Sequence, residues 1–187
     1  MPGWNKVGYN DTHWLQPEKV EAGAEILSAQ MTPPIEVIED ITPVSITEVK
    51  TDTFILDMGQ NMVGWVKLRV KGQKGDTVSM RFAERLDTDS SLYLDPIRTA
   101  KVNDLYILKG GEVEEWEPRF TYHGFQYVEI TGFPGKPALE NFTGRVVHDA
   151  LEPTGEFTTS NETINQIYQN ARWGIRGNYR SIPTDCP

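Results

Sequence analysis

The chain has 187 residues, of which 38% are hydrophobic and 24% charged, a composition typical of a globular protein and not of a disordered one. Its formal net charge of −9 argues against nucleic acid as a partner, because phosphate backbones are bound by basic surfaces. No apolar run approaches the roughly 20 residues of a membrane span, so we expect no membrane partner and no signal peptide before the fold. The single cysteine, Cys186, excludes an intramolecular disulfide and a cysteine-rich metal site.

Residues 1–32 show no clear periodicity. Trp4, Tyr9 and Trp14 stand among turn-forming residues, and the stretch EAGAEILSAQMTPP that follows is typical of a connector. Aromatic side chains at this density need a surface to bury against. Two interpretations stay open: the aromatic residues pack on the following domain, or they belong to the last strand of a domain that precedes this segment.

From Ile35 to about Thr158 the pattern favours β-strands. In GWVKLRVKG, Val66, Leu68 and Val70 fall on the same face, which predicts a strand with one buried side. Similar short runs, separated by glycine and proline, continue to the end of this region. About eight or nine strands without an intervening helix predict a mainly β fold: an antiparallel β-sandwich or jelly roll with two packed layers.

The pattern changes at Ser160, where apolar residues begin to recur at helical spacing and predict a C-terminal α-helix that ends near Gly177. The predicted apolar stripe consists of Ile164, Ile167, Tyr168, Ala171 and Ile175. Thr159 and Glu162 have the spacing of a capping box, with Ser160 as the alternative N-cap. The helix either packs back across the sheet, which the marginal stability of isolated helices favours, or begins another domain.

Acidic residues and histidines do not assemble a recognisable site in the sequence. One loop after a predicted strand is rich in carboxylates: Glu84, Asp87, Asp89 and Asp95. Carboxylates in such loops are mostly solvated, so a glycosidase pair or a calcium site there is the less favoured interpretation. His13, His123 and His148 lie too far apart for the short ligand spacings of zinc. We therefore expect no metal and no cofactor.

The string DMGQNMVGW is the most unusual part of the β region. It places Asp57, Gln60 and Asn61 between two predicted strands. Their polar groups either satisfy the backbone of a connection or form a patch that holds a neighbouring segment. Trp65 or Trp116, if exposed, would instead be a platform for stacking sugar rings, and the sequence does not decide between these possibilities.

Several longer motifs occur together and in order: LDMGQNMVGWVKLRVKGQKGDTVSMRFAERLD, AKVNDLYILKGG, EPRFTYHGFQYVEITG, GRVVHD and NARWGIRGNYRSIPTDCP. Over roughly residues 54–187 they resemble the bacterial α-L-rhamnosidases. The resemblance implies a β-sandwich followed by an all-helical α/α-barrel that carries the active site. It divides the chain into residues 1–32, the remnant of a preceding domain plus a linker; 33–158, a concanavalin-like β-sandwich; and 159–187, the first helix and loop of the barrel.

The resemblance also implies where the chemistry lies. Family members hydrolyse terminal α-L-rhamnosides with inversion, using two glutamates that would follow residue 187, so no catalytic residue is expected within this chain. Asp185 matches a family aspartate near the bound rhamnose and is the one expected substrate-binding residue. Because the chain ends inside the motif PTDCP, we expect a piece of a larger enzyme that is inactive by itself.

Two functions for this segment follow from the resemblance. The favoured one is a structural module that supports the catalytic barrel of the same parent chain, which is its expected partner. The alternative is a carbohydrate-binding module with its own sugar site. The first predicts an apolar surface left uncovered, whereas the second predicts an exposed tryptophan or tyrosine platform ringed by polar side chains.

Overall fold

The computed structural model describes residues 3–21, 23 and 27–184. The chain divides into two compact units, residues 1–31 and 32–187. The described part of the first unit has turns but neither helix nor strand. In it the rings of Tyr9 and Trp14 pack at a centroid distance of 5.6 Å, and Trp4 is exposed. The two aromatic residues thus provide each other with part of the contact surface that aromatic side chains need.

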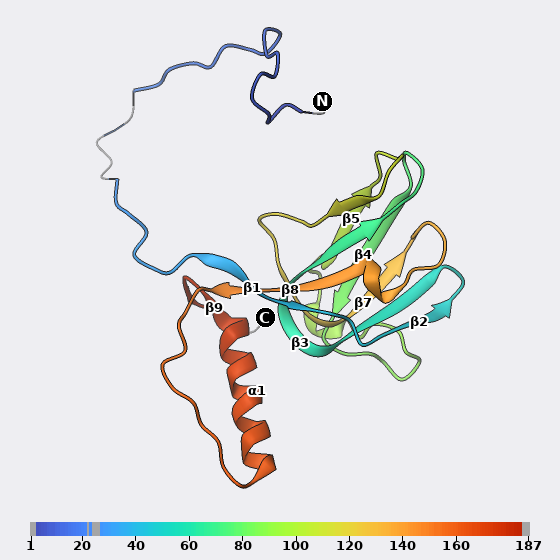
Figure 1. Cartoon of the computed structure of the whole chain (residues 1–187), viewed down its shortest axis with the longest axis vertical. Coiled ribbons are helices and arrows are strands. Elements are labelled where there is room, and N and C mark those ends of the chain that lie inside the picture. The colour runs from blue at the N-terminus through green and yellow to red at the C-terminus, as the bar shows by residue number, and fades with distance from the viewer. Residues whose placement is uncertain (1–2, 22, 24–26, 185–187) are drawn as a thin grey trace. The chain divides into compact units, whose positions relative to one another are not determined.

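The second unit contains one large antiparallel sheet and one α-helix (Figure 1). Its strands are β1 (Ile35–Ile41), β2 (Ser45–Lys50), β3 (Thr53–Val70), β4 (Thr77–Ala83), β5 (Asn103–Ile107), β6 (Glu114–Trp116), β7 (His123–Thr131) and β8 (Phe142–Asp149). They lie in the order β1-β8-β3-β7-β4-β5, and β2 and β6 each pair with β3. Short 3-10 turns occupy Asp95–Ile97 and Leu139–Asn141.

The long strand β3 holds the sheet together. Its first part, from Thr53 to Asp57, pairs with β2 and β7, and its last part, from Gly64 to Val70, pairs with β8 and β6. The register shifts between Asp57 and Met62, where Gly59 has a φ of 71° that favours glycine. The mainly β antiparallel class is confirmed, and the strands form one curled sheet, because β3 runs on through the bend where the sequence indicated a connection.

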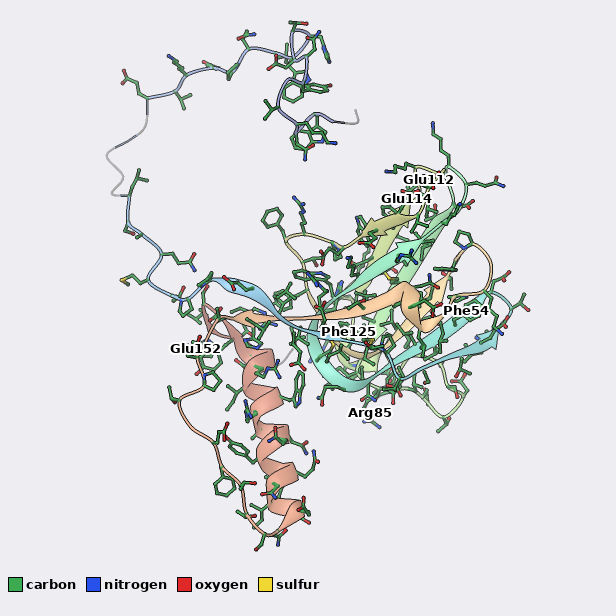
Figure 2. All side chains as sticks on the ribbon, in the orientation of Figure 1. Phe54, Arg85, Glu112, Glu114, Phe125 and Glu152 are labelled. Atoms are coloured by element: carbon green, nitrogen blue, oxygen red, sulfur yellow. The ribbon has the colours of Figure 1, made fainter. Side chains whose placement is uncertain are left out.

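The core lies inside the curl of the sheet. Val66, Leu68 and Val70 are each at most 1% exposed, which confirms the predicted period of two. Figure 2 shows Phe54 and Phe125 on the sheet, and both belong to this core. Its other buried members are Leu56, Met58, Met62, Val78, Met80, Phe82, Leu108, Val128, Ile130, Phe142 and Val146. Burying each large apolar side chain contributes about 1.5–3 kcal/mol, so this cluster is the main source of stability.

The helix α1 (Glu162–Asn178) begins after Asn161, whose side-chain oxygen accepts hydrogen bonds from the amides of Thr163 and Ile164. The N-cap is therefore Asn161, because this side chain reaches both amides; both predicted caps, Thr159 of the capping box and the alternative Ser160, lie before it and are wrong. Figure 1 shows α1 projecting away from the sheet, with its C-terminal end beside β1 and β8. Within the part of the chain that the structure describes, no helix has the length and apolarity needed to cross a membrane.

The apolar stripe of α1 does not pack across the sheet. The marginal stability of isolated helices had favoured such packing. Ile164, Ile167 and Ile175 are 43%, 61% and 56% exposed. Gly177 is the buried residue of α1, and Trp173 packs against the core. The helix therefore contacts the sheet through its C-terminal part and leaves most of its apolar side uncovered.

Candidate functional site at the sheet–helix junction

Arg176, in the last turn of α1, joins the helix to two strands. Its Nε lies 3.0 Å from Nε2 of His148 on β8, and its Nη2 lies 2.7 Å from a carboxylate oxygen of Glu39 on β1. Its guanidinium carbon also lies 4.1 Å from the ring centroid of Trp173. One cation thus fixes the helix end against both strands and against its own preceding turn.

His148 is neutral in this arrangement. Its Nδ1 lies 2.7 Å from the carbonyl oxygen of Asp149, which can only accept, and its Nε2 faces Arg176, which can only donate. The ring proton therefore resides on Nδ1. Burial lowers the pKa of His148, the positive charges of Arg176 and Arg180 lower it further, and the hydrogen bond to the Asp149 carbonyl opposes them.

Asp149, the last residue of β8, holds the segment that follows the helix. Its side chain is buried, and both carboxylate oxygens lie 2.8 Å from the amide nitrogen of Ser181. Ser181 has a φ of 67° and separates the two short strands β9 (Tyr179–Arg180) and β10 (Ile182–Pro183). A buried carboxylate that accepts from a backbone amide is a strong, specific anchor for such a turn.

Two further residues, Thr184 and Arg180, order this turn. The amide and hydroxyl of Thr184 lie 2.7 Å and 3.0 Å from the carbonyl oxygen of Asn178. Arg180 is buried, donates through Nη1 to the carbonyls of Arg176 and Tyr179, and places its guanidinium carbon 4.8 Å from the ring centroid of Tyr122. Burial lowers the pKa of Arg180 from its ordinary value. The sheet therefore determines the course of the chain up to Thr184.

A groove of about 260 Å³ separates the bend of β3 from α1. Gln60 and Asn61 line it on the sheet side, and Asn170 and Trp173 line it on the helix side. At the bottom of the junction, a Cβ on Gly177 would lie 3.2 Å from Val63, so a glycine allows the close approach of the two elements.

The groove shows how the unusual DMGQNMVGW string is used. A carboxylate oxygen of Asp57 accepts from the amide of Gly59 at 2.7 Å and from Gln126 at 3.0 Å. Asn61 donates to Glu84 at 2.8 Å. Asp57 thus satisfies the backbone of the bend, as one interpretation held. Gln60 and Asn61 line the groove opposite the helix, but their side-chain amides donate to the Asn61 carbonyl and to Glu84, so the interpretation that they hold a neighbouring segment stays a prediction.

The other candidate residues do not assemble a reactive site. Asp185 lies outside the described residues. Asp87 and Asp89 accept hydrogen bonds from Thr88 and Ser91 within their own turn. Across residues 3–21, 23 and 27–184, no group of three histidine, cysteine or acidic side chains could hold a metal ion.

His123 packs against an aromatic ring and lies within hydrogen-bonding distance of a neighbouring strand. Its ring stacks on Phe82 at a centroid distance of 4.3 Å, and its Nε2 lies 3.0 Å from a carboxylate oxygen of Asp104 on β5. These contacts tie the start of β7 to β4 and β5. They give His123 a packing role within the sheet.

The two tryptophans considered as sugar platforms are both engaged. Nε1 of Trp65 donates to a carboxylate oxygen of Glu117 at 2.7 Å, and the same oxygen accepts from Arg145 at 3.2 Å. Trp116 stacks on Tyr106 at 5.1 Å and packs against the core. Both side chains are half-buried, so neither is the fully exposed platform that sugar stacking would need.

Sequence reasoning missed the roles of Asp149, Arg176 and Arg180. The only signal was the order of residues: a His-Asp pair ends a strand, and the next helix ends with arginines in RWGIRGNYR. Pairing across 28 residues between His148 and Arg176 depends on how the helix turns back to the sheet, which local patterns do not encode.

Comparisons with known proteins agree with this architecture. The bacterial alpha-L-rhamnosidase concanavalin-like domain matches residues 47–148, and the bacterial alpha-L-rhamnosidase 6 hairpin glycosidase domain matches residues 152–187. An alpha-L-rhamnosidase of Streptomyces avermitilis is 45% identical over 186 residues, which are 99% of this chain and 18% of that protein.

Solved structures of such enzymes have the same fold. The α-L-rhamnosidase of Dictyoglumus thermophilum matches with a TM-score of 0.95 at 44% identity, over 100% of this chain and 21% of that one. The Streptomyces avermitilis enzyme complexed with L-rhamnose matches with a TM-score of 0.91 at 44% identity, over 98% of this chain and 18% of that one. The chain spans about a fifth of the length of these relatives. It belongs to the bacterial α-L-rhamnosidase family, and residues 47–148 are its concanavalin-like domain.

Proposed function

We propose that this chain is the non-catalytic β-sheet portion of an enzyme that hydrolyses terminal α-L-rhamnosides with inversion. Membership of the family supports the reaction class, and one relative was solved with L-rhamnose bound. Inverting glycosidases use a carboxylic acid and a carboxylate about 6.5–9.5 Å apart, with a water between them. In this proposal both carboxyl groups belong to the helical domain, and Asp185 contacts the sugar.

The role of the sheet in this proposal is to position the loop that precedes Asp185. The observation that carries it is the contact between Asp149 and Ser181, in which both carboxylate oxygens lie 2.8 Å from one backbone amide. Ser181 is four residues before Asp185. An error of about 1 Å in the placement of a substrate-binding group can cost roughly 100-fold in rate, so anchoring this loop would matter for catalysis.

The uncovered apolar side of α1 supports a docking role for the same unit. Its exposed isoleucines form an apolar surface whose contact with water is unfavourable: Ile164, Ile167 and Ile175. In the proposed enzyme the helices of the barrel cover this surface. The sheet, the junction and the first helix then act as one support for the catalytic domain.

The reaction assignment is tested by assaying the purified 187-residue chain on an aryl α-L-rhamnoside beside a full-length rhamnosidase that carries the same segment. We expect turnover from the full-length enzyme alone. Turnover by the 187-residue chain that survives further purification would show that both carboxyl groups are present within it, and would refute the proposal.

The positioning role is tested by hydrogen exchange in the 187-residue chain. Asp149→Ala removes a charged acceptor worth about 1.5–3 kcal/mol, so the Ser181 amide should exchange roughly 10- to 100-fold faster, while the amides shared by β3 and β7 are unchanged. Asp40→Ala, which removes an exposed partner of Arg145, is the matched control and should leave Ser181 protected. Unchanged exchange at Ser181 in the Asp149→Ala chain would eliminate the anchor.

A further inference from the structure

A second cavity, of about 550 Å³, lies on the side of β7, β4 and β5 that faces away from the core. Its floor is built from residues of these neighbouring strands, such as Arg81 and Glu129, and its wall from residues of the segment 94–102. Figure 1 shows β4 and β5 side by side, far along the chain from α1. The cavity shares no lining residue with the groove at the junction and is built from the sheet and the segment 94–102.

The cavity collects positive charge in an acidic chain. Arg81, Arg98 and Lys101 line it, and Glu129 is its one acidic lining residue among those described. None of these four forms an ion pair with another described residue, although Arg81 and Glu129 are partners across β4 and β7. Three cations against one anion leave a local charge of +2, whereas the whole chain carries −9.

The neutral polar groups of the cavity add donors. The hydroxyl of Ser79 donates to Oδ1 of Asn103 at 2.8 Å, so the amide oxygen of Asn103 is already in use. The Asn103 amide nitrogen, with its two N–H groups, has no partner within the described part of the chain. The cavity thus offers mostly hydrogen-bond donors, which fit a ligand rich in acceptors.

The backbone of Arg98 is strained. It has a φ of 52° and a ψ of −107°, a conformation that residues with a side chain seldom adopt. Strain of this kind persists where the surrounding structure holds it, and it concentrates at ligand-binding sites. The backbone conformation alone would favour glycine at this position, yet the residue is an arginine on the wall of the cavity.

We propose that this cavity binds a small carboxylated ligand, of the class of sugar acids. Guanidinium groups bind carboxylates through paired, charge-assisted hydrogen bonds, and Arg81 and Arg98 offer two such groups. Leu94, Ile97 and Leu105 line the same cavity and provide apolar contact for the carbon face of a ring. The volume of 550 Å³ falls within the range of small-molecule sites. This proposal goes beyond the support of a catalytic domain and stands independently of it.

The ligand class is tested by titrating the 187-residue chain with glucuronate, followed by calorimetry and by amide shifts in nuclear magnetic resonance spectra. We expect saturable binding, with shifts concentrated at residues 97–103 and on β4. Neutral L-rhamnose should not bind here, because it has no carboxylate to occupy the arginines. Inorganic sulfate should bind at least tenfold more weakly, because it has no ring to contact the apolar wall.

Substitutions locate the site. Arg81→Gln and Lys101→Gln should each weaken glucuronate binding about tenfold, as expected for loss of one charged hydrogen-bonding partner. Arg98→Gly removes a guanidinium and relieves the strained backbone, so it should weaken binding while the melting temperature stays equal or rises. Arg119→Gln, at an exposed arginine outside the cavity, is the matched control and should bind as the parent chain does.

Three results would overturn this proposal. The first is the absence of glucuronate binding in a chain whose spectrum shows the native fold. The second is equal affinity for sulfate and glucuronate, which would reduce the cavity to an unselective oxyanion site. The third is unchanged affinity in the Arg81→Gln and Lys101→Gln chains, because the ligand would then be bound elsewhere.

Discussion

The imidazole of His148 accepts from Arg176 at 3.0 Å through Nε2, while its Nδ1–H donates to the Asp149 carbonyl at 2.7 Å. Both contacts require the neutral ring with its proton on Nδ1. A second proton on Nε2 would turn this atom into a donor facing a guanidinium. The attachment of α1 to β8 therefore depends on the protonation state of one side chain.

The stability of the chain should accordingly fall in mildly acidic solution. Burial and two arginines lower the pKa of His148 below 6.5, so the unfolded chain binds this proton more tightly than the folded chain does. The neutral ring therefore contributes to the free energy of unfolding above pH 6.5. This contribution is lost as the pH falls from 6.5 through the folded pKa. Thermal melts across this range should show a larger loss in the parent chain than in the His148→Gln chain, which does not titrate.

Acidic residues titrate in both chains, so their effect cancels in that difference. His13→Gln, at an exposed histidine in the first unit, is the control and should melt with the same pH dependence as the parent. If parent and His148→Gln chains lose stability equally, the neutral histidine does not stabilise the junction.

Gly64 should not tolerate a side chain. It lies in β3 between β7 and β8, and a Cβ there would be 1.8 Å from the carbonyl oxygen of Arg145. Gly64→Ala should lower the free energy of unfolding by about 3 kcal/mol or more, because a backbone atom has to move. Gly174→Ala, in open space on α1, should instead raise it by roughly 0.5–1 kcal/mol. Urea unfolding of the two chains measures both changes, and a mild effect at Gly64 would show that the strands can separate there.

Glu114 should stabilise the turn between β5 and β6 as a carboxylate. It accepts from the hydroxyl of Tyr106 at 2.6 Å and from the amides of Lys109 and Gly110 at 3.2 Å and 2.9 Å. The hydrogen bond from Tyr106 is the largest cause that lowers the pKa of Glu114 below 4.5, so this stabilisation is present above pH 4.5 and lost as the pH falls through the folded pKa. Glu114→Gln should melt earlier than the parent near neutral pH, and the difference should shrink in acid.

The nearby Glu112 is the matched control for Glu114. Figure 2 shows the two residues close together at the end of the sheet, and Glu112 is exposed. Glu112→Gln should melt as the parent does at every pH. In a separate alkaline titration, the difference in phenol absorbance between the parent and Glu114→Gln chains should follow Tyr106, whose pKa is raised to about 12 by burial and by the Glu114 carboxylate. In the Glu114→Gln chain this pKa should move toward 10.

The apolar side of α1 should matter in the full-length enzyme and not in the 187-residue chain. Ile164 and Ile167 are 43% and 61% exposed, so changing both to glutamine should alter the free energy of unfolding of this chain by less than about 0.5 kcal/mol. The same change in a full-length rhamnosidase should lower its melting temperature, because buried contacts with the barrel would be lost. Leu56→Ala, at a residue with 0% exposure, should cost about 2–5 kcal/mol in either context. A full-length enzyme that tolerates both glutamines would contradict the docking role.

Local sequence patterns correctly predicted the elements whose apolar residues recur with a clear period. Alternation in Val66, Leu68 and Val70 identified their buried face, and the helical spacing after Ser160 identified α1. The N-cap was predicted one or two residues too early, because Thr159, Ser160 and Asn161 are all good caps and the geometry of the first turn decides between them. The continuity of β3 through its bend was not predicted, because the glycines there indicate a turn as readily as a bulge.

Sequence by itself determined the composition class, the antiparallel β architecture, the helix and the family resemblance, because each of these depends on residue order over short stretches or on motifs in series. Tertiary structure alone decided that Arg176 meets His148 and Glu39, that Asp149 holds Ser181, and that three cations share one cavity. These contacts join residues far apart in the chain. Their partners are chosen by how the sheet curls and where the helix returns, which no local pattern of residues specifies.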